Sequence, residues 1–141
     1  MQQKPQTLTQ DPASPAGGRL ILLADDALDN QRLVQFFLER AGYDVHIVAN
    51  GEEAVTQVRR QSDLGRHYDL ILMDMQMPRL DGFEATRAIR ELGFSNPIIA
   101  LTASSLPADK QLCLDAGCDD YLAKPFDFEP LLTLIAAKLE S

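Results

Sequence analysis

The chain has 141 residues, of which 45% are hydrophobic, and a formal net charge of −8 at neutral pH. This length favours one domain with a single core. The chain is acidic and has no basic run longer than Arg59-Arg60, which argues against a nucleic-acid surface. Because neither a secretory leader nor an apolar stretch of about 20 residues occurs, we expect a cytoplasmic protein without a membrane span.

The first eighteen residues differ in composition from the rest of the chain. Residues 1–18 are rich in Gln, Thr, Pro, Ser and Gly and contain few large apolar side chains. Such a segment cannot bury enough apolar surface to offset the entropy of ordering it. We therefore expect a flexible tail or linker over residues 1–18 and a folded domain over residues 19–141.

Short apolar runs recur along the folded part and predict its strands. Residues 20–24 and 70–73 are continuous apolar runs, typical of strands buried on both faces, and residues 98–101 and 121–123 form shorter runs. Residues 44–48 alternate polar and apolar side chains instead. This alternation indicates a half-exposed strand at the edge of the sheet.

Helical patterns separate these runs and carry recognisable termini. Asn50 with Glu53, and Asp81 with Glu84, resemble capping boxes. A later helix is expected to end near Gly117. The last two helices are expected to start at Pro107 and at Asp127 with Pro130, and two earlier helices to stop at Gly42 and Gly93. The apolar spacing also predicts which helix positions face the core. These expected inner positions are Leu33, Val34, Phe37, Leu38, Ala41, Ala54, Val55, Val58, Phe83, Thr86, Ile89, Leu112, Cys113, Ala116, Leu131, Leu134, Ile135 and Leu139. Strands that alternate with helices in this way predict an α/β fold, a parallel sheet with helices on both faces.

Polar side chains stand where several of these strands end. Asp25-Asp26 follows the first strand, Asp74 the third, Thr102 the fourth and Lys124 the fifth. The carboxyl ends of parallel strands share one rim, so these groups should lie together. Two charges at about 4 Å repel by about 4 kcal/mol at an effective dielectric of about 20, and one lysine cannot neutralise three acids. Oxygen ligands of this kind favour Mg²⁺.

Each of these signals has a plain structural interpretation when it is taken singly. Asp-Asp after a strand is usually a solvated turn or helix cap, Lys124-Pro125 a loop, and Thr102 a β-branched strand residue. Taken jointly, at successive strand ends, they favour a functional site. In this order and spacing the set resembles the receiver domain of response regulators over residues 19–139. The resemblance implies a flavodoxin-like (βα)5 fold with strand order 2-1-3-4-5.

The resemblance also implies a chemistry. Asp74 would be the phosphoacceptor, which takes a phosphoryl group from a phosphohistidine of a histidine kinase or histidine phosphotransfer protein. Asp26, Asp74 and the backbone carbonyl of Gln76 would bind Mg²⁺ directly, and Asp25 would reach it through water. Lys124 would pair with Asp74 or with the phosphoryl group. Such a module phosphorylates and dephosphorylates itself but is not a metabolic enzyme.

A switch is implied as well. Thr102 and Tyr121 would change position on phosphorylation and alter the face built from the fourth helix, the fifth strand and the fifth helix, where a downstream protein partner would bind. The Lys124-Pro125 peptide bond is expected to be cis. The plain alternative for Tyr121 is a strand tyrosine with its polar tip at the surface.

The segments 73–78, 81–87 and 97–103 are similar to receiver modules of hybrid histidine kinases. The first loop departs from that pattern, because such modules often carry Asn directly after the acidic pair, where this chain has Ala27. The metal site does not depend on that position. Whether the module acts alone or as part of a hybrid kinase therefore stays open.

Two rival functions require residues that this chain does not have. A phosphohydrolase of the haloacid dehalogenase type would need an acid two residues after the nucleophile, where Gln76 stands. A flavin-binding module would need hydroxyls and glycines in the first loop, but residues 25–29 carry three acids that repel phosphate.

Cysteine and histidine offer no competing metal site. Cys113 and Cys118 have no second cysteine pair, so we expect two reduced thiols rather than a zinc site. His46 is expected to face solvent on the edge strand and His67 to lie in a charged loop, so neither is expected to donate a phosphoryl group.

Overall fold

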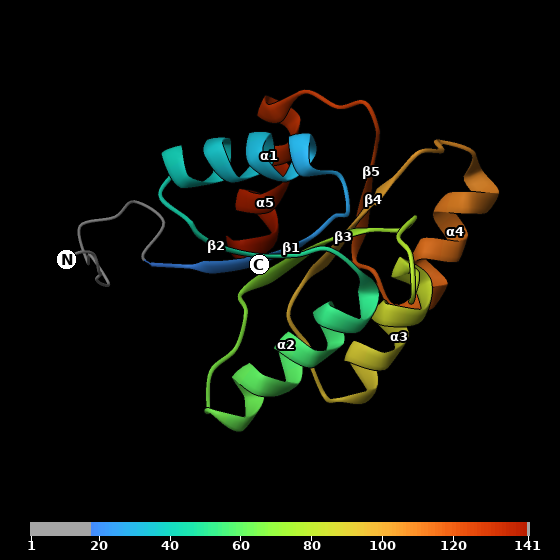
Figure 1. Cartoon of the computed structure of the whole chain (residues 1–141). Coiled ribbons are helices and arrows are strands. Elements are labelled where there is room, and N and C mark those ends of the chain that lie inside the picture. Colours follow the sequence, from blue (N-terminus) through green and yellow to red (C-terminus); the bar gives the residue numbers. More distant parts are fainter. Residues whose placement is uncertain (1–17, 141) are drawn as a thin grey trace.

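A computed structural model of the chain describes residues 18–140, so the tail expected over residues 1–18 lies outside the described residues apart from Gly18. Five parallel strands form one sheet in the order β2-β1-β3-β4-β5, which confirms the expected topology (Figure 1). The elements are β1 (Leu20–Ala24), α1 (Leu28–Arg40), β2 (Asp44–Val48), α2 (Gly51–Asp63), β3 (Leu70–Asp74), α3 (Gly82–Glu91), β4 (Ile98–Thr102), α4 (Pro107–Ala116), β5 (Asp120–Ala123) and α5 (Phe128–Glu140).

The helices cover the sheet in two layers. α1 and α5 lie on one face, and α2, α3 and α4 on the other (Figure 1). Each layer closes a separate apolar core, because alternate side chains of the central strands point to opposite faces. Ile21 and Leu23 of β1 pack with Val34 and Ile135 in the first core, whereas Leu22 packs in the second. The continuous apolar runs of β1 and β3 are thus explained by burial on both faces.

The strand register aligns the carboxyl ends of the strands. Ala24 pairs with Met73, and Asp74 pairs with Leu101. Thr102 pairs with Ala123, the residue before Lys124. The groups that follow β1, β3, β4 and β5 are therefore delivered to one rim, as the sequence predicts.

Side-chain caps hold the starts of α2 and α3. Asn50 Oδ1 accepts the backbone N–H of Glu53 at 2.9 Å, and Asp81 Oδ1 accepts that of Glu84 at 2.9 Å. Gly117 ends α4 with a φ of 119°, a left-handed conformation that favours glycine. These capping predictions are confirmed.

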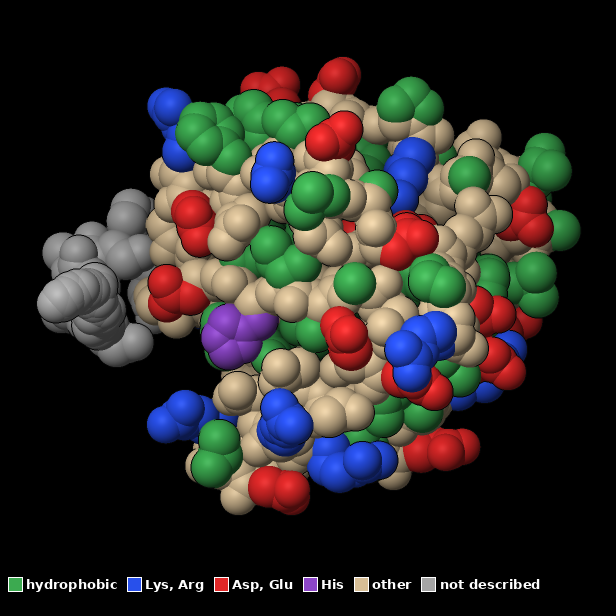
Figure 2. Space-filling view, in the orientation of Figure 1, with side chains coloured by type: hydrophobic (Ala, Val, Ile, Leu, Met, Phe, Trp, Pro, Cys, Tyr) green, Lys and Arg blue, Asp and Glu red, His purple; other side chains and the backbone are tan. Residues whose placement is uncertain are grey.

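Two expected inner positions are wrong. Leu33 is 51% exposed and Leu112 is 49% exposed, whereas Val34 and Cys113, their neighbours in the chain, are fully buried. The buried stripe of each helix is narrow, and adjacent positions turn by about 100° around the helix axis, so one of two consecutive apolar residues faces solvent. In Figure 2, hydrophobic side chains are visible on the surface over α1.

The histidine and cysteine side chains lie apart from the rim. His46 Nδ1 lies 2.8 Å from the hydroxyl of Tyr68, and burial raises the pKa of Tyr68 to about 12. Cys113 and Cys118 are buried free thiols, and burial raises the pKa of Cys118 to about 12. Within residues 18–140, no helix combines the length and apolar character that crossing a membrane requires.

Candidate functional site

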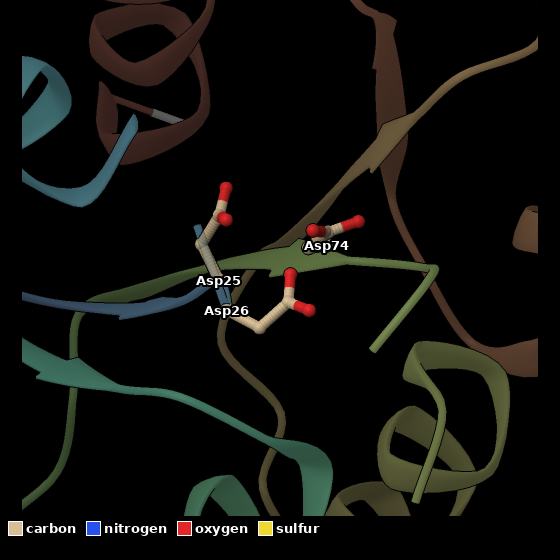
Figure 3. A group of neighbouring side chains, drawn as sticks. All are labelled: Asp25, Asp26 and Asp74. Atoms are coloured by element: carbon tan, nitrogen blue, oxygen red, sulfur yellow. The ribbon is translucent and has the colours of Figure 1, made fainter. Parts of the chain in front are cut away.

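Three carboxylates converge at the rim of the sheet. Asp25 and Asp26 follow β1, Asp74 ends β3, and one oxygen of each lies within 4.8 Å of the others. In Figure 3 the side chains of Asp26 and Asp74 extend to the same side, and that of Asp25 extends upward in the view from the end of β1. Among the described residues this is the group of acidic, histidine or cysteine side chains placed to hold a metal ion.

Asp74 is nearly buried and is held at both oxygens. Its Oδ1 accepts the backbone N–H of Gln76 at 3.0 Å, and its Oδ2 accepts Lys124 Nζ at 3.1 Å. Burial raises the pKa of Asp74, although the hydrogen bonds from Gln76 and Lys124 act in the opposite direction. The ionised carboxylate is therefore destabilised where it stands, and an additional cation at this rim would stabilise it.

Lys124 joins the two buried acids. Its Nζ lies 3.1 Å from Asp74 Oδ2 and 3.4 Å from Asp25 Oδ2. Burial alone would lower its pKa, but the hydrogen bond and charge of Asp74, together with Asp25, raise it above its usual range. The ammonium is thus fixed in its charged form. The peptide bond to Pro125 is cis, as predicted.

Thr102 closes the rim beside Asp74. It is the last residue of β4 and is 6% exposed. Its Oγ1 accepts the backbone N–H of Ser104 at 3.2 Å, so the hydroxyl hydrogen can be donated elsewhere. Ser104 in turn donates to Asp109 Oδ2 at 2.5 Å, which links the rim to α4.

The donor set fits a hard divalent cation. Three carboxylates carry more negative charge than Lys124 neutralises, and all three offer oxygen, the ligand atom that Mg²⁺ takes in proteins. Asp26 is exposed, so the site is open to solvent on one side. An open site is also what Mg²⁺ favours, because it keeps several of its waters.

Mg²⁺ is therefore expected to raise the thermal stability of the protein. At a concentration of 100 times its Kd, a ligand that binds only the folded state adds about 2.7 kcal/mol, which moves the Tm of a domain of this size by about 10 °C. Asp26→Asn removes one charge from the cluster and should reduce the shift to a small fraction of this. Differential scanning calorimetry with Mg²⁺ and with a chelator measures it. A shift of equal size in both proteins would contradict the assignment.

The family model described as response regulator receiver domain matches residues 21–136. The chain belongs to the response regulator receiver domain family. It is a signalling module of two-component systems.

Receiver domains of different architectures are similar to this one. Two-component response regulator ORR41 of Oryza sativa subsp. japonica is 42% identical over 118 residues, which cover 82% of this chain and 91% of that protein. Hybrid signal transduction histidine kinase I of Dictyostelium discoideum is 39% identical over 123 residues, which cover 84% of this chain. The matched region is only 7% of that kinase. The receiver module is therefore the part shared with both.

Solved receiver domains share the fold. One is the receiver domain of a sensor histidine kinase from Pseudomonas aeruginosa PAO1, solved with a magnesium ion in its active site cleft. It is 44% identical to this chain with a TM-score of 0.76, and the match covers 88% of this chain and 99% of that one. The receiver domain of Saccharomyces cerevisiae Ssk1, in complex with the histidine phosphotransfer protein Ypd1, is 31% identical with a TM-score of 0.79, and the match covers 86% of this chain and 88% of that one.

The receiver site thus gathers most of the side chains that the sequence singled out. Lys124 donates hydrogen bonds to both Asp25 and Asp74, and Asp26 completes the acidic cluster. Gln76 contributes its backbone N–H to Asp74. Further along the rim, Thr102 and Tyr121 lie on the adjacent strands β4 and β5, and the switch role of both stays a prediction.

Two residues of α1 hold Asp25 but were not predicted from the sequence. Asn30 Nδ2 donates to Asp25 Oδ2, and Gln31 Nε2 donates to the backbone carbonyl of Asp25 at 2.5 Å. One signal could have found them: Ala27, at the N-cap of α1, has no side-chain oxygen with which to cap the helix. The loop after β1 must then be held by side chains from within the helix.

Proposed function

We propose that this receiver domain accepts a phosphoryl group from a phosphohistidine onto Asp74 and passes the signal on by a change of shape. The observation that carries the proposal is the pairing of Asp74, 4% exposed, with Lys124 at 3.1 Å inside an acidic cluster. This pair combines the two groups that the transfer needs: the carboxylate is the nucleophile, and the cation beside it neutralises the charge of the transferred phosphoryl group.

The residues of the chain divide the work of the transfer. A carboxylate oxygen of Asp74 forms a bond to phosphorus as the phosphorus–nitrogen bond of the donor breaks. The donor imidazole, protonated on its other ring nitrogen, keeps the electron pair of that bond and leaves as neutral imidazole. Lys124 can then bind an oxygen of the phosphoryl group. Thr102 can donate its hydroxyl hydrogen to another, because its Oγ1 is the acceptor, not the donor, in the hydrogen bond with the Ser104 N–H.

The proposal includes Mg²⁺. Asp26, Asp74 and the backbone carbonyl of Gln76 would hold the ion directly, and Asp25 would reach it through water. When bound, Mg²⁺ supplies positive charge to the oxygens of the phosphoryl group. Asp26 is the exposed member of the cluster, so it is the acid that an ion from solvent meets first.

The proposed phosphodonor is a histidine kinase or a histidine phosphotransfer protein. The likeness to the Ssk1 receiver domain, solved in complex with Ypd1, supports a donor of this kind. We propose a cytoplasmic location, in keeping with the free thiols of Cys113 and Cys118, and a receiver domain over residues 19–141 preceded by a tail. Nucleic acid is not a proposed partner, because the net charge is −8 and acidic side chains are spread over the face in Figure 2.

A small phosphodonor tests the proposal. The protein is incubated with acetyl phosphate, with Mg²⁺ or with a chelator, and intact mass spectrometry measures the phosphoryl adduct. We expect an adduct that requires Mg²⁺. Absence of the adduct at saturating Mg²⁺ and acetyl phosphate would refute self-phosphorylation.

We propose that the downstream partner binds the face formed by α4, β5 and α5. A groove of about 590 Å³ runs along β5 and α5 and is bordered by Tyr121, Leu122, Pro130 and Leu134. Lys110 Nζ of α4 lies 4.7 Å from the ring centroid of Tyr121, so the ring is in contact with a side chain of the helix. A change in Tyr121 would alter both the groove and its border.

The anchoring of α4 supports movement of this face. Its buried side chains, Cys113 and Ala116, lie toward the C-terminal end. That end is also fastened to α3, because Arg90 donates to the carbonyl of Gly117 at 3.0 Å and pairs with Asp119 at 2.7 Å. The N-terminal end, next to Thr102, has weaker apolar anchoring, so it is the end expected to move.

Thr102→Ala is expected to separate binding from switching. Fluoroberyllate with Mg²⁺ mimics the phosphoryl group, and in the native protein it should change the NMR shifts of residues 104–124 as well as those near Asp74. Because the variant lacks the hydroxyl that would respond to the phosphoryl oxygens, the changes at residues 104–124 should be much smaller while Mg²⁺ affinity is retained. Equal changes in both proteins would exclude Thr102 as the switch.

A further inference from the structure

Asp25 is fully buried, and both of its carboxylate oxygens are held by donors of the chain. Its Oδ1 accepts the backbone N–H of Ala27 at 2.9 Å. Its Oδ2 accepts two donors, the side-chain amide of Asn30 and Lys124 Nζ at 3.4 Å. Asn30 is therefore a neutral donor that shares one oxygen with the cation of the site.

This sharing bears on the position of Lys124. The ammonium lies 3.1 Å from Asp74 and 3.4 Å from Asp25, so it is poised between two buried carboxylates. A buried carboxylate oxygen with too few donors is costly, and a mobile cation moves toward it. Because Asn30 supplies a donor without charge, Asp25 draws less on Lys124, and the ammonium is left closer to Asp74.

We propose that Asn30 is a positioning residue for phosphoryl transfer: it holds the Asp25 carboxylate and thereby keeps Lys124 directed at Asp74. The inference rests on the proposed role of Asp74 as phosphoacceptor. Asn30 lies in the first turn of α1, and its side-chain amide donates to Asp25 rather than to Asp74 or Asp26. Its effect on the reaction passes through Asp25 and Lys124.

The neighbouring residue offers a matched control. Gln31 Nε2 donates to the backbone carbonyl of Asp25 at 2.5 Å, so it fastens the same loop to the same helix without touching the carboxylate. If Asn30 only stabilised the loop, replacing either amide should have the same consequences. If Asn30 positions the carboxylate, only its own replacement should affect Lys124.

The test compares Asn30→Leu with Gln31→Leu in the whole chain. Three quantities are measured: Mg²⁺ affinity by NMR titration, the rate of Asp74 phosphorylation by acetyl phosphate at saturating Mg²⁺, and the position of Lys124 Nζ in crystal structures. For Asn30→Leu we expect a rate about tenfold lower, the size of effect of a hydrogen bond to a charged group, with Mg²⁺ affinity changed by less than about threefold. Lys124 should lie nearer to Asp25 than to Asp74. Gln31→Leu should keep the native rate and the native position of Lys124.

Asn30→Ser, which keeps a donor of shorter reach, should recover part of the rate and serves as the second variant if Asn30→Leu does not fold. An equal loss of rate in the Asn30 and Gln31 variants, or a native position of Lys124 in Asn30→Leu and Asn30→Ser, would overturn the proposal. Failure of the native protein to become phosphorylated would instead refute the proposed function. The position of Lys124 in the variants would still show whether Asn30 keeps the ammonium directed at Asp74.

Discussion

Asp74→Asn is expected to abolish covalent phosphorylation by acetyl phosphate. A carboxylate oxygen of Asp74 is the proposed nucleophile, and an amide oxygen is a poor one. The substitution keeps the size of the side chain, so the fold and the hydrogen bond from the Gln76 N–H should persist. Intact mass spectrometry measures the result. The assignment is falsified if the adduct persists in Asp74→Asn at the native level.

The same variant is expected to be more stable than the native protein when Mg²⁺ is chelated. Burial raises the pKa of Asp74 above its usual 3.8, so the folded state holds the proton more tightly than the unfolded state does. Stability from the neutral carboxyl is then present below pH 3.8 and is lost as the pH rises through the folded pKa. At neutral pH the native protein bears this cost and the asparagine variant does not.

Urea denaturation at several pH values measures the difference in unfolding free energy between the two proteins. The advantage of Asp74→Asn should be largest at neutral pH and should shrink toward acid pH, where Asp74 becomes neutral in the folded protein as well. Added Mg²⁺ should stabilise the native protein more than the variant. If Asp74→Asn is instead less stable than the native protein at neutral pH in chelator, the stabilisation from the pair of Asp74 with Lys124 is larger than the cost of burying the Asp74 charge.

The order of the fold could be predicted because burial on both faces leaves a direct trace in sequence. The run Leu70–Met73 has no polar alternation, and the structure buries every one of its residues. β2 alternates and lies at the edge. The helix faces were harder to predict, as Leu33 and Leu112 show. An apolar residue next to the buried stripe of a helix can be either buried or exposed. The packing of the neighbouring elements determines which of the two it is, and the residue spacing does not reveal that packing.

The candidate site was predictable only in part, for a related reason. Acids, Thr102 and Lys124 at strand ends are informative because the parallel register forces strand ends together. No strand register places Asn30 and Gln31 near the site, because both lie on a helix. An amide on the first turn of a helix is ordinarily solvated, so its residue type alone does not indicate a contact. Their contacts to Asp25 depend on how α1 is set against the loop after β1, which residue spacing does not specify.

Lys124→Met is expected to destabilise the protein in chelator and to make its stability depend strongly on Mg²⁺. The methionine keeps much of the length of the side chain but leaves the buried carboxylates of Asp25 and Asp74 without their shared cation. Asp25 Oδ2 keeps Asn30 as a donor, but Asp74 Oδ2 loses its donor, and an unsatisfied buried acceptor costs about 1–3 kcal/mol. A divalent ion held by the same acids should offset most of that cost.

A double variant separates charge from packing. If the loss in Lys124→Met comes from unpaired charge, adding Asp74→Asn should restore part of it, because one of the two buried carboxylates is then neutral. If the loss comes from packing of the lysine stem, the two substitutions should act independently. Urea denaturation of the native protein, both single variants and the double variant, in Mg²⁺ and in chelator, gives the coupling free energy. A coupling near zero in chelator would mean that Lys124 does not serve as the counter-ion of Asp74 in the folded protein.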